Sequence, residues 1–383
     1  MTAAATGTEV VVVGGGIAGV SAAAFAAAAG ASVTLVEREA DLSAHTTGRS
    51  AALLLASYGP AQARRLTAAS RGFLDDPPDG FVDGPLLAPR GVVWVGTQDD
   101  RAMLAQVAAD ATALDPGARQ IDASAVRELC PVLRPEHAAA GVLEPSAADI
   151  GVAALHAGFV RMLRRAGAVV LRAAPVLALS RTSTGWTVTA GADTLGCDVV
   201  VDAAGAWGDQ VAALASLAPL GLQPLRRTAM TVALPPGTEA RGWPSVNQVR
   251  GEWYFKPEGD GLLVSPADQT PSAACDARPD PLDVVLGLER VAAATTLTLR
   301  SVRTAWAGLR TFCTDGELAI GPDPADPSFV WCVGQGGYGI QTAAAAGRLT
   351  ADSALGLGTG WAAQAGIDTH ALAPGRLSTQ EQR

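Results

Sequence analysis

The sequence predicts an α/β protein of two to three domains, one of them built on a parallel sheet. Its 383 residues exceed one typical domain of about 150 residues. Apolar residues make up 49% of the chain and charged residues 17%, which supplies a large core and excludes a disordered chain. The parallel sheet is predicted near the N-terminus, where a strand, a glycine turn, a helix and a second strand follow one another.

The elements of this unit are predicted in order. Residues 10–13 are four consecutive valines, which suit a buried parallel strand. Residues 17–29 predict a helix that ends at Gly30, because glycine is favoured after the last helical turn. Residues 32–36 predict the second strand, and Glu37 follows it directly.

A glycine motif connects the first strand to the helix. Gly14, Gly16 and Gly19 form G-x-G-x-x-G, in which the first glycine permits a tight turn and the second admits a pyrophosphate. The third lets the helix pack on the strand, and free N–H groups at the helix start bind phosphates. Glu37 lies about 20 residues further on, where a carboxylate accepts hydrogen bonds from the ribose hydroxyls. An isolated motif would be an ordinary glycine turn, but this context predicts an adenosine diphosphate site, without distinguishing NAD from FAD.

A polar turn follows the second strand. Thr46-Thr47-Gly48-Arg49-Ser50 carries hydroxyls, a glycine and an arginine. Such a turn can close over a flavin pyrophosphate from the other side, although an ordinary surface loop has the same composition.

Charge and cysteine content exclude several other classes. The net charge is −9, from 28 basic and 37 acidic residues, and no basic block is present, so nucleic acid is an unsuitable partner. The five cysteines are scattered without a Cys-x-x-Cys pair, which predicts no metal site, no disulfide framework and a cytoplasmic location. Residues 10–36 are uncharged, but their five glycines and the lack of a basic start favour a chain without a transmembrane segment.

Three later segments complete a recognisable succession. Residues 197–207 predict a buried strand that runs into Ala-Ala-Gly-Ala-Trp, and residues 329–333 predict another strand. Residues 334–341 read Gly-Gln-Gly-Gly-Tyr-Gly-Ile-Gln and lead into an alanine-rich helix that ends near Leu355. Over nearly its whole length the chain resembles the D-amino-acid oxidase superfamily of FAD-dependent amine and amino-acid oxidoreductases.

Within that superfamily the chain most resembles the bacterial FAD-dependent D-arginine dehydrogenases. The matching stretches are residues 47–52, 66–71, 221–224, 294–298, 306–310 and 335–342.

The resemblance implies how the chain divides. A Rossmann-like FAD-binding domain is expected from residues 1–80, 150–222 and 311–383. A substrate-binding domain with a mixed, largely antiparallel sheet is expected from residues 81–149 and 223–310. The cofactor is expected to be FAD without a covalent link.

The motif and the resemblance together give the expected cofactor-binding residues, which lie in seven segments of the chain. They are Gly14, Gly16, Ile17, Ala18, Gly19, Glu37, Arg38, Thr47, Gly48, Arg49, Ser50, Ala51, Val176, Ala204, Gly205, Gly308, Gly336, Gly337, Tyr338, Gly339, Ile340 and Gln341. For Tyr338 an ordinary core position is an equal alternative.

Four residues are expected to be catalytic. Arg227 and Arg310 match the two arginines that bind the substrate carboxylate in that family, and Tyr58 and Tyr254 match pocket tyrosines. A guanidinium makes two parallel charge-assisted hydrogen bonds to a carboxylate, which orients it as well as binding it. Arg226 is an alternative to Arg227, because neighbouring strand residues face opposite sides.

The resemblance also implies the reaction. A hydride passes from the substrate α-carbon to flavin N5, and water hydrolyses the resulting imine to a 2-oxo acid and ammonia. Backbone N–H groups of residues 337–340 are suited to the negative charge of reduced flavin. The four histidines match no pocket position, and no general base is assigned.

Substrate preference is predicted from departures within the resemblance. In arginine-specific relatives a glutamate binds the distal guanidinium, and an ungapped alignment puts Val92 there. Leu53 and Leu55 replace a histidine and a threonine of the same pocket. An unpaired guanidinium against these side chains would cost several kcal/mol, so a D-amino acid with a neutral, largely apolar side chain is expected. Ser245 and Asn247 match further pocket positions, and Gly337 is also expected to contact substrate.

Two other functions remain open. One is a sarcosine- or glycine-type amine or N-alkyl-amino-acid oxidase that reduces oxygen. In sarcosine oxidases a lysine near the flavin promotes that step, and Leu263 stands at the matching position, which favours a dehydrogenase with a quinone or another carrier as acceptor. The other is a flavoprotein that binds FAD without turnover, which the retained arginines and tyrosines disfavour.

Overall fold

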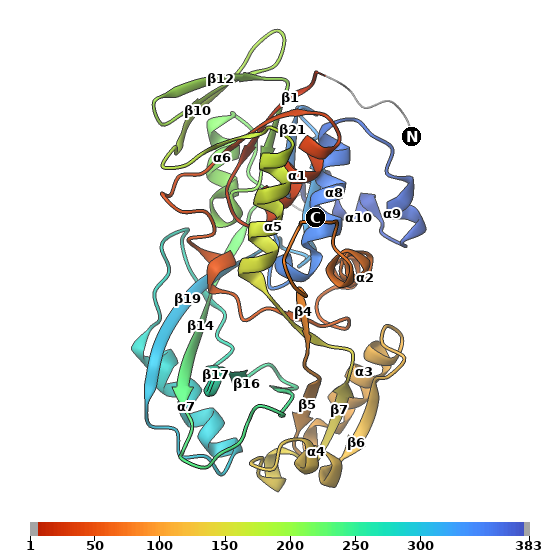
Figure 1. Ribbon diagram of the computed structural model, residues 1–383, viewed down its shortest axis with the longest axis vertical. Helices are drawn as coiled ribbons and strands as arrows, with labels where there is room; N and C mark the ends of the chain where they lie inside the picture. The colour runs from red at the N-terminus through yellow and green to blue at the C-terminus, as the bar shows by residue number, and fades with distance from the viewer. Residues whose placement is uncertain (1–6, 379–383) are drawn as a thin grey trace.

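A computed structural model describes residues 7–378 of the chain (Figure 1). Its first layer is a six-stranded sheet in the order β20-β21-β13-β1-β2-β9. All neighbours in it are parallel except β20 and β21. The strands are β1 (Glu9–Val13), β2 (Ser32–Val36), β9 (Val169–Leu171), β13 (Val199–Asp202), β20 (Ala319–Pro322) and β21 (Phe329–Val333).

The predicted strand–turn–helix–strand unit is present. The valines of β1 are buried because β2 and β13 pair with its two edges and helices or strands cover both faces. Helix α1 (Ile17–Ala28) ends one residue before the predicted end, and Gly30 adopts a φ of +98°. β2 and β21 have the predicted bounds, and the predicted last helix is α8 (Gly339–Ala354).

Different elements cover the two faces of the parallel sheet. Val10 and Val12 face α1, α8 and α5 (Val152–Arg165), whereas Val11 and Val13 face a three-stranded meander and α6 (Gly208–Leu214). The meander consists of β10 (Val176–Arg181), β11 (Trp186–Ala190) and β12 (Asp193–Cys197). The sheet is therefore an inner layer with its core on both sides, as parallel sheets require.

Close packing against α1 positions helix α8. α1 and α8 approach each other so closely that a Cβ on Gly347 would lie 2.5 Å from the Ser21 hydroxyl oxygen. This contact places the start of α8 next to the glycine turn after β1.

A second sheet occupies the other half of the molecule (Figure 1). Its order is β18-β14-β17-β16-β15-β5-β7-β6, with β19 also paired to β14. Only β15 and β5 are parallel, so the sheet is mixed and largely antiparallel, as expected. The strands are β5 (Val92–Gly96), β6 (Arg119–Asp122), β7 (Ala140–Glu144), β14 (Gln223–Ala233), β15 (Ser245–Gln248), β16 (Tyr254–Glu258), β17 (Gly261–Ser265), β18 (Thr270–Pro271) and β19 (Val302–Phe312).

The strands of the two sheets come from different segments of the chain. The six-stranded sheet takes its strands from residues 1–80, 150–222 and 311–383, and the mixed sheet takes its strands from the intervening segments. Two features cross the expected boundaries. β19 runs on to Phe312, and a small sheet of β3 (Leu53–Leu54), β8 (Ala148–Ile150) and β4 (Leu87–Pro89) uses segments from both halves.

The remaining helices lie at the periphery. They are α2 (Ala61–Asp75), α3 (Arg101–Thr112), α4 (Ala123–Leu129), α7 (Pro281–Ala294), α9 (Gly360–Gln364), α10 (Thr369–Leu372) and α11 (Gly375–Ser378).

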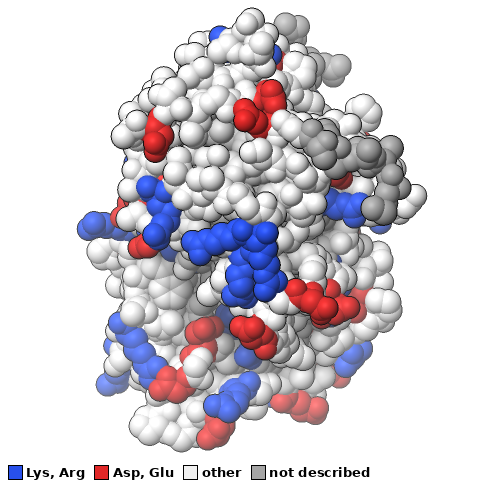
Figure 2. Space-filling view, turned by 45° about the horizontal axis from the view of Figure 1, so that its top comes forward, with Lys and Arg blue, Asp and Glu red and all other residues white. Residues whose placement is uncertain are grey.

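The surface carries no broad field of one charge on the face that Figure 2 shows. Basic and acidic side chains are scattered among uncharged ones, with one group of basic side chains near the middle. Within residues 7–378 no helix combines the length and the apolar character needed to cross a membrane.

Candidate functional site

The turn after β1 leaves no space for side chains at its glycines. Gly14 has a φ of +111°, and a Cβ there would lie 2.5 Å from the carbonyl oxygen of Ala203. A Cβ on Gly19 would lie 1.9 Å from the carbonyl oxygen of Gly14. Gly15, which lies inside the motif, is less constrained, since its Cβ would approach the end of the Leu42 side chain, at 2.4 Å, rather than backbone.

Glu37 is held at the end of β2 by two backbone donors. Gly15 N donates to its Oε2 at 2.7 Å and Glu39 N donates to its Oε1 at 2.8 Å. The carboxylate is 9% exposed and lines the groove beside the glycine turn. Each oxygen can accept a further hydrogen bond, so the carboxylate is able to bind ribose hydroxyls of a ligand in the groove.

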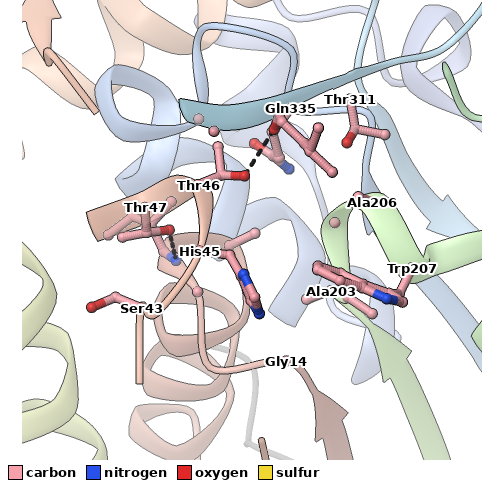
Figure 3. A pocket seen from close by; sticks show the side chains of 18 of the residues that line it. Gly14, Ser43, His45, Thr46, Thr47, Ala203, Ala206, Trp207, Thr311 and Gln335 are labelled. Carbon is pink, nitrogen blue, oxygen red and sulfur yellow. Dashed lines mark hydrogen bonds between the residues drawn. The ribbon is translucent and has the colours of Figure 1, made fainter. Parts of the chain in front are cut away.

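The Thr-Thr-Gly-Arg turn is a short 3₁₀ helix that joins the two halves (Figure 3). Thr47 Oγ1 accepts a hydrogen bond from Ile17 N at 3.0 Å, and Thr46 Oγ1 donates to Leu309 O at 2.8 Å. Arg49 donates to the backbone of residues 277 and 307 and pairs with Asp276. These bonds fix the start of α1 relative to β19.

A groove runs from Glu37 along the glycine turn to the start of α8. Of the expected cofactor residues, it is lined by Gly14, Gly16, Ile17, Ala18, Glu37, Arg38, Thr47, Arg49, Ser50, Ala51, Val176, Ala204, Gly205, Gly308, Gly336, Gly337, Gly339 and Ile340. Gly19, Gly48 and Tyr338 lie outside its lining, and Gln341 lines a neighbouring cavity instead. An elongated groove that begins at a ribose-accepting acid and a glycine turn fits an extended dinucleotide.

His45 and Trp207 also line this groove, and the histidine was not expected there. Their rings lie side by side with centroids 4.8 Å apart (Figure 3). His45 Nε2 contacts Glu39 Oε1 at 3.0 Å, and the Arg38 guanidinium lies over the Trp207 ring. The prediction that no histidine occupies a pocket position is therefore wrong for His45.

The two expected carboxylate-binding arginines come from adjacent strands. Arg227 on β14 is paired with Gly308 on β19, and Arg310 is paired with Leu225, so both arginines project from one face of the pair. Arg226 faces the other way, and its Nη2 contacts Asp283 Oδ2 at 2.8 Å. This geometry selects Arg227 over Arg226.

Neither guanidinium has a carboxylate within 4.0 Å among residues 7–378. Arg310 Nη1 donates to Tyr58 Oη at 3.0 Å, and Arg227 Nε donates to the carbonyl oxygen of Asp268 at 2.6 Å. Burial, together with the charge of Arg310, lowers the pKa of Arg227. Two guanidinium groups without a direct ion-pair partner in this part of the chain are suited to an anion, although the charge of the nearby Asp268 carboxylate also acts on Arg227.

A second cavity continues from the groove. Both cavities are lined by Ser50, Ala51, Arg227, Tyr254, Arg310, Gly337 and Ile340. The second cavity adds Tyr58, Leu53, Leu55 and Asn247 of the expected residues, together with Trp94, Trp253, Gln248, Gln269 and Gln341. No carboxylate belongs to its lining within the described part of the chain.

Two expected substrate contacts lie behind this lining rather than in it. Val92 and Ser245 are both 0% exposed and are paired with each other on β5 and β15. Two residues further along the same strands, Trp94 and Asn247 are also paired and do line the cavity. Of the two expected residues on β15, Asn247 therefore reaches the cavity and Ser245 does not, and on β5 Trp94 lines the cavity instead of Val92.

The glycine turn before α8 lies against the arginine site. A Cβ on Gly337 would be 2.7 Å from Tyr58 Oη and 3.2 Å from Arg310 Nη1. Gln341 Oε1 accepts from Leu55 N at 3.1 Å, which holds the Leu53–Leu55 segment on α8. Tyr338 packs edge to face on Tyr58 and lies in the core.

An elongated groove that begins at Glu37 and a glycine turn, and continues into a cavity with two arginines, fits a dinucleotide cofactor next to a substrate pocket. The family model "FAD dependent oxidoreductase" (DAO) matches residues 9–353, and the chain belongs to this family. It is an FAD-dependent oxidoreductase. The glycine turn, Glu37 and the groove fit FAD, and these residues would hold it.

Individual relatives agree with this assignment. A bovine (Bos taurus) protein, "FAD-dependent oxidoreductase domain-containing protein 1", is 31% identical over 188 residues. That match covers 42% of this chain and 36% of the bovine protein's length. It supports the family but leaves most of the bovine protein unmatched.

Solved structures share the fold over nearly the whole chain. Glycine oxidase from Geobacillus kaustophilus has a TM-score of 0.81 at 20% identity, covering 96% of this chain and 98% of its own. L-proline dehydrogenase from P. horikoshii has a TM-score of 0.84 at 18% identity, covering 98% and 99%. L-amino acid deaminase from Proteus vulgaris has a TM-score of 0.79 at 15% identity and covers 98% of both chains. At these identities the likeness shows the fold.

Proposed function

We propose that this protein oxidises the CH–NH bond of an amino acid whose carboxylate is bound by Arg227 and Arg310. The observation that carries this proposal is the pair of guanidinium groups on one face of β14 and β19, both lining the groove and the cavity. Because neither guanidinium has a carboxylate within 4.0 Å in residues 7–378, both are suited to a ligand carboxylate.

The chain's own residues bind and orient the substrate. FAD supplies the two-electron acceptor when it is bound. Arg310 is oriented by its hydrogen bond to Tyr58, so the two side chains fix one edge of the carboxylate site. Tyr254 lines both cavities and limits where the α-carbon can lie. Proton release from the substrate amine passes to water or to a tyrosine, and no side chain is assigned as general base.

The side chain that the cavity accepts is neutral in this proposal. Leu53, Leu55 and Trp94 give the cavity an apolar wall, and Asn247 and Gln269 are its uncharged polar groups. A cationic side chain would enter beside two arginines and meet no acid, which costs more than its apolar contacts return. The D configuration of the substrate rests on the resemblance to D-arginine dehydrogenases.

The electron acceptor is proposed to be a quinone or another carrier. Lys256, the only lysine in the sequence, binds Asp149 at 2.7 Å and lies outside the linings of both cavities. Leu263 is 3% exposed on β17 and also lies outside them. No lysine therefore lines either cavity in the part of the chain that the structure describes, which supports an acceptor other than oxygen.

An anaerobic flavin-reduction screen tests the proposal. D-amino acids, L-amino acids, glycine and N-methyl amino acids are each mixed with the holoprotein, and loss of flavin absorbance is followed. We expect neutral D-amino acids such as D-leucine and D-methionine to bleach the flavin faster than D-arginine. Fastest reduction by sarcosine or glycine, with rapid reoxidation in air, would instead support an amine oxidase. Absence of bleaching by every compound would support a non-catalytic flavoprotein.

A further inference from the structure

A buried carboxyl group lies directly behind the second cavity. Glu144 ends β7 and is 1% exposed. Its Oε1 accepts hydrogen bonds from Trp94 Nε1 and from Ser57 Oγ, both at 2.7 Å. Its Oε2 is buried without a hydrogen-bond partner among the described residues.

These two hydrogen bonds reach two different parts of the site. Trp94 lines the cavity on β5, beside Asn247 of β15. Ser57 precedes Tyr58, whose hydroxyl accepts a hydrogen bond from Arg310. One carboxyl oxygen therefore connects Trp94, on the cavity wall, to the segment of Tyr58, which accepts a hydrogen bond from Arg310.

The cost of burying this carboxyl indicates a specific role. Burial raises the pKa of Glu144, and its Oε2 has no hydrogen-bond partner among the described residues, so burying this carboxyl carries a cost. An apolar residue of similar size would fill the same space without that cost. What an apolar residue lacks is an acceptor for the indole N–H of Trp94.

We propose that Glu144 is a positioning residue that fixes the Trp94 indole as the end wall of the cavity, and that this wall limits the length of the substrate side chain. The inference rests on the proposed function, because it assumes that a ligand carboxylate is bound at Arg227 and Arg310. Leu53 and Leu55 line the same cavity as Trp94 and the two arginines. The distance from the bound carboxylate to the indole therefore sets the length of side chain that the cavity accepts.

The test uses straight-chain carboxylates from acetate to octanoate as probes. Each is titrated into the holoprotein, and its dissociation constant is read from the shift in flavin absorbance. The variants are Trp94→Ala, Trp94→Phe, Glu144→Leu and Glu144→Gln. Glu252→Gln is the matched control, because Glu252 is exposed and lies outside the lining of the cavity.

In the wild type we expect affinity to increase with chain length and then to fall once the chain reaches the indole. Trp94→Ala should tighten the longest carboxylates by about tenfold, the effect of the methylenes that the new space accommodates. Acetate, which is too short to reach the indole, should bind both Trp94 variants as it binds the wild type. Trp94→Phe and Glu144→Leu should weaken the length limit, whereas Glu144→Gln should retain it, because its amide oxygen accepts the same two hydrogen bonds.

The outcomes separate this inference from the function on which it depends. If carboxylates bind but Trp94→Ala leaves the length profile unchanged, Trp94 is not the end wall. If Glu144→Leu and Trp94→Phe both keep the wild-type profile, Glu144 does not position it. If the wild type binds no carboxylate at all, the proposed function itself is wrong, and the inference falls with it.

Discussion

Two neighbouring arginines on β14 have opposite surroundings. Arg226 is bound to Asp283, whereas Arg227 projects into the groove and the cavity with Arg310. The alternation of a strand therefore decides which of them is available to a ligand.

Loss of either cavity arginine should weaken substrate binding selectively. Arg310→Met or Arg227→Met removes one partner of a desolvated charge pair, for which about 2 kcal/mol or more is expected. The measurement is the substrate dissociation constant from anaerobic flavin titration. Arg226→Met is the control, with wild-type affinity and wild-type flavin content. Unchanged affinity in Arg310→Met would refute the assignment.

Single residues also show where the sequence was insufficient. The alignment assigned Val92, Ser245 and Asn247 to the substrate pocket, and of these only Asn247 lines the cavity, beside its strand partner Trp94. Val92 and Ser245 lie on the same faces of the same strands, and the alternation of a strand does not tell which residue along a face reaches the cavity. His45 lines the groove but was matched to no pocket position, although it directly precedes the polar turn that the sequence singled out.

At the scale of an element, the turn between β1 and α1 depends on backbone contact. Gly14→Ala would place a methyl group 2.5 Å from the Ala203 carbonyl oxygen at a φ of +111°. We expect protein that contains little flavin, measured as the ratio of flavin to protein absorbance after purification. Gly72→Ala in α2 is the matched control, since a Cβ there contacts nothing within 4 Å. Full flavin content in Gly14→Ala would contradict this view of the turn.

The groove also bears on how FAD is attached. None of the five cysteines lines it, which supports the expectation of non-covalent FAD. Acid precipitation should therefore release the yellow chromophore into the supernatant. Colour retained in the pellet would contradict the expectation, and His45→Ala would then test whether that ring is the point of attachment.

At the scale of the whole molecule, one buried acid should make stability depend on pH. Burial raises the pKa of Asp202, at the end of β13, to about 8 from 3.8. Between these values the folded protein binds a proton that the unfolded chain does not, so stability falls as the pH rises toward 8. Asp202→Asn keeps an acceptor for Ala204 N and cannot ionise.

We expect Asp202→Asn to show a smaller loss of stability between about pH 4 and pH 8, the window that its shifted pKa defines. Denaturant unfolding at a series of pH values and fixed FAD concentration measures it. Asp193→Asn, at an exposed acid on β12, should reproduce the wild-type slope. An unchanged slope in Asp202→Asn would show that Asp202 is ionised in the folded protein.

Some parts of the overall architecture could be predicted from local sequence patterns, and others could not. Local patterns were sufficient for β1, α1, β2 and β21, because valine runs and glycine turns determine short buried strands. The second sheet was expected only from the resemblance, since its strands pair residues far apart, as in Val92 with Ser245. The small sheet of β3, β8 and β4 had no local signal, because each strand is two or three residues long.

In the proposed function, different parts of the backbone bind the substrate carboxylate and select the substrate side chain. The arginines are set at a fixed spacing by backbone hydrogen bonds between these two strands, whereas Leu53, Leu55, Trp94 and Asn247 come from β3, the segment after it, β5 and β15. Substitutions in the second group can therefore change which molecule is accepted while the anchor for its acidic end stays intact. Specificity can therefore diverge within one fold through substitutions at these four positions alone. Random libraries confined to them are the smallest libraries in which variants with new substrates are expected.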